Sequence, residues 1–87
     1  MAQVEQVLLR RDPSAGPYKV LREKIVAARK AAGLSQETLA QQIGRPQSVV
    51  AKVERGERSI DVVEFLAIGR LIGLDVQDAL AAVEAEL

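Results

Sequence analysis

The segment from Ala31 to Glu57 contains signals for two short helices separated by a tight turn, and this arrangement restricts the fold more than any other feature of the chain. Ser35 is placed to cap the first helix, because its hydroxyl can accept hydrogen bonds from free amides in the following turn. Gly44 is placed to end that helix, since glycine takes a positive φ at little cost. Pro46 opens the second helix, where its missing N–H costs nothing, and Gly56 ends it. This pattern predicts a helix-turn-helix, whose second helix can enter a DNA major groove.

A wider set of residues at fixed spacing extends this pattern from about residue 21 to residue 80. The set comprises Arg29, Gly33, Leu34, Ser35, Gln36, Leu39, Ala40, Ile43, Gly44, Val50, Val53, Glu54, Arg55, Gly56, Leu71, Ile72, Gly73 and Leu74. It resembles the Cro/phage-repressor (Xre-like) family of helix-turn-helix DNA-binding domains. The resemblance implies an all-α fold of five helices, similar to the lambda repressor, with a central helix-turn-helix.

Composition limits the other possibilities. The 87 residues are enough for one small domain, and 48% apolar with 28% charged residues is typical of a globular protein. The chain has no Cys and no His, which excludes disulfides and the usual thiolate or imidazole metal sites, so we expect no metal and no cofactor. We see neither a signal peptide nor a membrane span, and therefore expect a cytoplasmic protein.

The charges are divided along the chain, although the net charge is zero. Residues 18–58 hold nine basic and four acidic residues, whereas residues 59–87 hold one basic and six acidic residues. A basic half of this kind suits a surface that faces phosphate, with the acidic half facing water or a partner. The alternative is that charged helix surfaces are ordinary and the division is accidental.

We divide the chain into an N-terminal arm or linker, residues 1–17, and a helix-turn-helix domain, residues 18–87. The arm could be disordered, or it could pack on a second protein. The first helix of the domain is predicted over residues 18–32, with Leu21, Ile25, Ala28 and Ala32 on its buried side. The resemblance pairs Arg29 of this helix with Glu54, an ion pair that would tie the first helix to the third.

The helix at about 47–55 is predicted to contact the bases. With Val50 and Val53 inward, helical spacing turns Ala51 and the base-reading candidates outward or to the flanks; these candidates are Gln47, Ser48, Val49 and Lys52. Gln47 can bond adenine through both amide atoms, and Val49 can meet a thymine methyl. Phosphate contacts are expected from Gln36, Arg45, Arg55 and Arg58. The alternative for this face is a protein-binding surface.

Two residues depart from the family pattern. Pro46 stands where a Ser or Thr hydroxyl commonly caps the base-contacting helix and contacts a phosphate. That hydroxyl contact is therefore lost, and the positive charge of Arg45 could meet the phosphate instead. Glu57 stands where a basic residue is common, and this leaves Arg55 and Arg58 to meet the phosphates. Both changes weaken the case for DNA binding slightly.

The last two helices are predicted to follow Asp61, which starts a capping box with Glu64, and Asp75. Val62, Phe65, Leu66 and Ile72 are the expected buried side of the first of them. The second carries an apolar stripe longer than a small core requires, and repressors of this type often pair through these two helices. We therefore expect a homodimer with an interface at Phe65, Val76, Leu80, Val83 and Leu87. The alternative is that the last helix folds back on its own core.

The most consistent function is a sequence-specific regulator of transcription that binds double-stranded DNA. An enzyme is not expected, because the chain lacks a nucleophile beside a base and a Gly-rich phosphate loop. Single-strand or RNA binding is disfavoured by the scarcity of aromatic residues. The alternative is an antitoxin-like interaction module, in which the same fold also or instead binds a partner protein, for example through the N-terminal arm.

Overall fold

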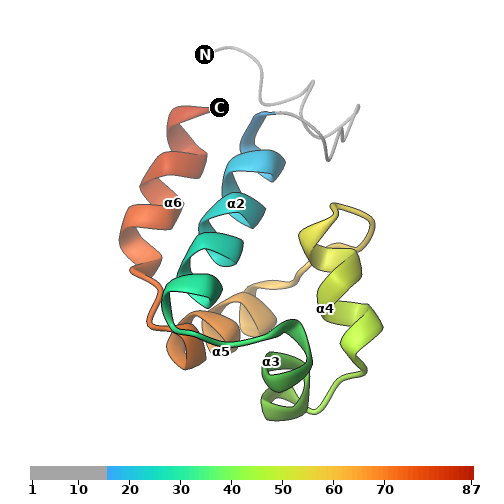
Figure 1. The fold of residues 1–87 in the computed structure, drawn as a ribbon. Coiled ribbons are helices and arrows are strands. Elements are labelled where there is room, and N and C mark those ends of the chain that lie inside the picture. Colours follow the sequence, from blue (N-terminus) through green and yellow to red (C-terminus); the bar gives the residue numbers. More distant parts are fainter. Residues whose placement is uncertain (1–15) are drawn as a thin grey trace.

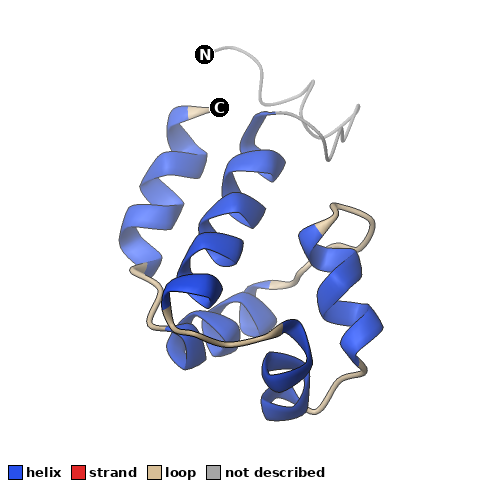
Figure 2. Cartoon of the chain, in the orientation of Figure 1, coloured by secondary structure: helices blue, strands red, loops and turns tan. Residues whose placement is uncertain are grey.

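The computed structural model describes residues 16–87, and that part of the chain consists of five α-helices without strands (Figures 1 and 2). The helices are α2 (Gly16–Ala31), α3 (Gln36–Ile43), α4 (Gln47–Glu54), α5 (Val62–Ile72) and α6 (Val76–Ala85). The predicted all-α class and five-helix arrangement are confirmed. The predicted arm falls mostly on residues 1–15, which lie outside the described residues. None of the helices in residues 16–87 has the length and hydropathy needed to cross a membrane.

The helix boundaries follow the local capping signals closely. Ser35 accepts the backbone N–H of Thr38 at 3.0 Å, and Gly44 ends α3 with a φ of 67°. Asp61 and Glu64 form the predicted capping box at the start of α5. Pro46 gives α4 no side-chain cap, as its missing hydroxyl requires. α2 begins two residues earlier than predicted, because Pro17 fits the first helical turn, where an N–H is not needed.

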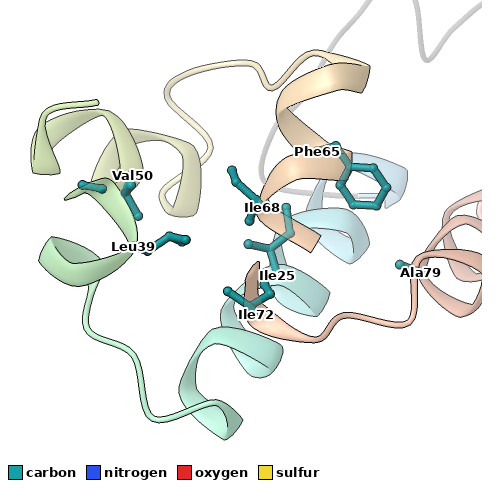
Figure 3. Packing of buried hydrophobic residues seen from close by; sticks show 8 residues of the cluster. Ile25, Leu39, Val50, Phe65, Ile68, Ile72 and Ala79 are labelled. Carbon is teal, nitrogen blue, oxygen red and sulfur yellow. The ribbon is translucent and has the colours of Figure 1, made fainter. Parts of the chain in front are cut away.

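The hydrophobic core is built from residues of all five helices. The buried cluster consists of Ile25, Leu39, Ala40, Val50, Phe65, Ile68, Ile72 and Ala79 (Figure 3). α6 lies beside α2 (Figure 1), with Ala79 fully buried, and Lys24 Nζ of α2 donates to Asp78 Oδ2 at 3.0 Å. One side of α6 therefore folds back on the protein's own core.

The buried side of α5 differs from the prediction. Val62 is 72% exposed and Leu66 is 48% exposed, whereas the buried residues are Phe65, Ile68, Gly69 and Ile72. The prediction was wrong for Val62 and Leu66 because α5 is apolar on nearly every side, so its hydrophobic pattern does not select one face. Gly69 permits close packing there, since a Cβ at this position would lie 3.0 Å from Cγ2 of Val76.

The predicted dimer interface needs correction at Phe65. Phe65 is buried in the core and Val76 is packed against it, so Phe65 cannot contribute an exposed surface. Leu80 is half exposed on α6, where it lines an open hollow with Val83 and Leu87. The two large apolar residues that are most exposed, Val62 and Val63, lie on α5. We call Val62, Val63, Leu66, Ala67 and Leu71 the outer face of α5.

Candidate nucleic-acid interface

A buried ion pair holds the last residue of α4 against α2. Arg29 Nε donates to Glu54 Oε2 at 2.6 Å and Arg29 Nη2 donates to Glu54 Oε1 at 2.9 Å, so the planar guanidinium meets both carboxylate oxygens. The third nitrogen, Nη1, donates to the backbone carbonyl of Leu34 at 2.8 Å. The hydrogen bond to Glu54 raises the pKa of Arg29 above its ordinary value, against the opposing effect of burial. This pair fixes the position of α4 relative to α2.

Two glutamines continue this network to the surface. Gln36 Nε2, at the start of α3, donates to Glu54 Oε1 at 2.8 Å, and Gln47 Nε2, at the start of α4, donates to Gln36 Oε1 at 2.9 Å. Gln47 keeps its carbonyl oxygen and its second N–H available, which are the two groups that a bidentate contact to adenine requires. Both glutamines were predicted from the sequence to contact DNA, whereas the hydrogen bond between them was not expected.

The exposed face of α4 is narrower than the sequence indicated. Gln47, Ser48 and Lys52 are exposed, and Ser48, Lys52 and Arg55 are spaced so that they share one side of the helix axis. Ala51 is buried, which corrects its predicted place outside or on the flank. Val49 is partly buried and lines a small pocket with Ile43 and Ile60, so it is turned partly towards the core. Because the apolar residues of α4 are wholly or partly buried, the residues that it exposes are mainly polar.

The three candidate phosphate-binding arginines lie around the two ends of α4, and each meets a carboxylate. Arg55 Nε donates to Glu57 Oε2 at 2.6 Å in the loop that follows α4, which lowers the pKa of Glu57 and raises that of Arg55. Arg58 Nη2 donates to Glu64 Oε2 at 3.1 Å, and Arg45 Nη2 approaches the same oxygen at 3.5 Å.

Glu64 thus lies beside the segments that flank α4, where Arg45 and Arg58 are, although it belongs to the acidic half of the sequence. The capping box placed it correctly in the first turn of α5, but its contacts with Arg45 and Arg58 are tertiary and were not expected. The separation of a basic half from an acidic half therefore does not hold in space. Asp78 is a second example, because this residue of the acidic half pairs with Lys24 of the basic half.

Comparisons with known proteins agree with this arrangement. The family described as helix-turn-helix matches residues 25–78. A solved structure, an XRE-family like protein from Pseudomonas syringae pv. tomato str. DC3000, is similar at 37% sequence identity with a TM-score of 0.75. The similarity covers 97% of this chain and 96% of that chain. The comparison with curated proteins gives no match.

Proposed function

The chain belongs to the XRE-type helix-turn-helix family, and from this premise we propose that it is a repressor-like regulator that binds specific sequences of double-stranded DNA. In this proposal α4 enters the major groove. The observation that carries it is the exposed amide of Gln47, which is oriented through Gln36 and Glu54 by a network anchored in α2. A side chain ordered before binding loses less conformational entropy when it contacts a base.

The exposed residues of α4 have distinct roles in this proposal. Gln47 bonds N6 and N7 of adenine, and Ser48 meets a base edge or a phosphate. Lys52, one turn further along, reaches guanine or a phosphate. Val49 contributes at most a limited apolar contact, because it is only partly exposed. Gln36, Arg45, Arg55 and Arg58 position the protein on phosphates without reading the sequence.

Selection from a pool of random duplexes, followed by competition binding at several salt concentrations, tests this function. We expect the selected duplex to bind at least about 1,000-fold more tightly than random duplex, with affinity falling steeply as salt rises. Equal affinity for selected and random duplexes at every salt concentration would contradict the proposal.

A homodimer is also proposed, paired through the outer face of α5 instead of α6. The outer face of α5 presents exposed Val62, Val63, Leu66 and Leu71, and a hollow of about 320 Å³ lies between this helix and the end of α3. Asp61 precedes α5 and Arg70 lies near its other end, so an antiparallel pair would bring opposite charges together. α6 carries acidic residues and no basic one, so pairing along it would bring like charges together.

Two matched substitutions distinguish these surfaces. Val63→Asp should convert the dimer to a monomer in sedimentation equilibrium, whereas Leu80→Asp on α6 should leave the dimer intact. The opposite pattern would return the interface to α6. A two-fold dimer would place its two α4 helices about 34 Å apart, matching half-sites one DNA turn apart.

A monomer at every concentration would favour the second candidate function, an antitoxin-like module. In that case the outer face of α5 is available for a different protein. Co-expression with the product of a neighbouring gene, followed by co-purification, tests this candidate directly.

A further inference from the structure

Glu64 contacts an arginine in each of the two segments that flank α4. Its carboxylate accepts from Arg58 Nη1 at 3.3 Å and Nη2 at 3.1 Å in the loop after α4, and from Arg45 Nη2 at 3.5 Å in the turn before it. It also accepts the backbone N–H of Asp61 at 3.1 Å as its half of the capping box. The Glu64 side chain is only 18% exposed, whereas those of Arg58 and Arg45 are 35% and 48% exposed.

The Glu64 carboxylate is charged at neutral pH. The hydrogen bond from Arg58 and that from the backbone of Asp61 lower the pKa of Glu64 to about 2. The two arginines and Glu64 therefore contribute one net positive charge to this surface instead of two. Arg58 is the more strongly held, since it also donates from Nη1 to the carbonyl of Ser59 at 3.0 Å.

A carboxylate and a phosphate compete for the same guanidinium N–H groups, because both present pairs of anionic oxygens that match the guanidinium fork. Glu64 cannot withdraw from this competition without giving up its place in the capping box. Any phosphate that binds Arg58 or Arg45 must therefore share the arginine with Glu64 or displace it.

We propose that Glu64 is a specificity-determining residue that suppresses binding to random DNA by competing with phosphates for Arg58 and Arg45. The inference rests on the proposed function and adds a residue that itself contacts no DNA. On random duplex, attraction to phosphates supplies nearly all the affinity. Competition by Glu64 for the arginines therefore lowers the affinity for random duplex, and no base contact compensates for the loss.

On the specific site the same contacts have a compensating benefit. Base contacts fix α4 in the groove, and Glu64 holds an arginine ready at each end of that helix. Arg45 and Arg58 are then already ordered before the complex forms, so binding costs less conformational entropy. This saving offsets the competition between Glu64 and the phosphates. Glu64 therefore lowers random binding more than specific binding.

The test is Glu64→Gln, which removes the charge but keeps a side chain that serves in a capping box. We expect random-duplex affinity to rise about three- to ten-fold and its log–log salt slope to steepen by about one, as expected for one more phosphate contact. Affinity for the selected duplex should change less than two-fold. The ratio of specific to random affinity therefore falls.

Two further variants separate this role from simpler ones. Glu37→Gln removes the same charge from an exposed carboxylate of α3 that makes no ion pair within residues 16–87, and it should leave the ratio and the slope unchanged. In an Arg58→Gln background, Glu64→Gln should lose most of its effect. An equal rise with Glu37→Gln, or an unchanged ratio with Glu64→Gln, overturns the proposal. Failure of the wild-type chain to bind DNA selectively is a different result, because it contradicts the proposed function itself.

Discussion

Two ion pairs near the end of α4 have the same shortest distance but opposite surroundings. Arg29–Glu54 and Arg55–Glu57 each have an Nε–Oε2 distance of 2.6 Å. The side chains of the first pair are 9% and 7% exposed, whereas those of the second are 56% and 55% exposed. The first joins α2 to α4, and the second spans two residues of one loop. Distance alone therefore does not reveal what an ion pair contributes.

The difference lies in what else each pair contacts. Around Arg29–Glu54, the remaining guanidinium nitrogen bonds Leu34 and the carboxylate also accepts from Gln36, so few polar atoms are unpaired. Both side chains of Arg55–Glu57 are more than half exposed, so a phosphate can replace the Glu57 carboxylate at Arg55. We interpret the buried pair as a structural element of the fold and the exposed pair as an exchangeable part of the DNA-facing surface.

The largest expected effect comes from breaking the buried pair. Arg29→Ala should lower the free energy of unfolding by about 3–5 kcal/mol, because it leaves the Glu54 carboxylate buried without its partner. Chemical denaturation measures this decrease. A decrease below about 1 kcal/mol, the range of exposed pairs, would remove the distinction between the two pairs.

The second-largest effect is expected at Gln47, the exposed end of the hydrogen-bond network that runs from Glu54 through Gln36. Gln47→Ala should weaken binding to the selected duplex by about 1–3 kcal/mol and change random binding little, since it removes a base contact. Lys52→Ala is the comparison: if Lys52 binds a phosphate, removing its charge weakens binding to both duplexes and flattens the salt slope. Equally weakened binding to both duplexes for Gln47→Ala would show that Gln47 does not read bases.

A smaller effect is expected from acid. The pKa of Glu64 is lowered from 4.5 to about 2 in the folded protein, so its ion pairs stabilise the fold above the unfolded value and lose that contribution as pH falls towards 2. The wild-type melting temperature should exceed that of Glu64→Gln at pH 7, and the difference should shrink between about pH 4.5 and pH 2. If the difference in melting temperature stayed constant between about pH 4.5 and pH 2, the charged Glu64 carboxylate could not be its source.

The smallest effect on stability belongs to the exposed pair. Arg55→Ala should leave thermal unfolding unchanged, because more than half of each side chain in this pair is accessible to water. Its DNA-binding salt slope should become shallower by about one if Arg55 meets a phosphate. A large drop in melting temperature would mean that the two pairs are equivalent after all.

Features encoded by neighbouring residues could be predicted from the sequence. The caps at Ser35, Gly44 and Asp61 depend on contacts within about four residues, and all three are found in the structure. The exposed side of α5 could not be chosen, because Val62 and Leu66 are as apolar as the residues that are buried.

Tertiary polar contacts were harder to predict. The Arg29–Glu54 pair was expected only from resemblance to a family, since its partners are 25 residues apart. Nothing in the spacing of Glu64 and Arg45 or of Gln36 and Gln47 indicates that these side chains meet. Their contacts depend on how α3, α4 and α5 pack, which local patterns do not determine.

The most direct test of the central claim is an NMR titration of the isotope-labelled chain with the selected duplex. If the exposed face of α4 reads DNA, the amide and side-chain signals of Gln47, Ser48 and Lys52 should shift most, and those of the exposed residues of α6 should remain unchanged. Shifts confined to α5 and α6, with α4 unaffected, would contradict the account.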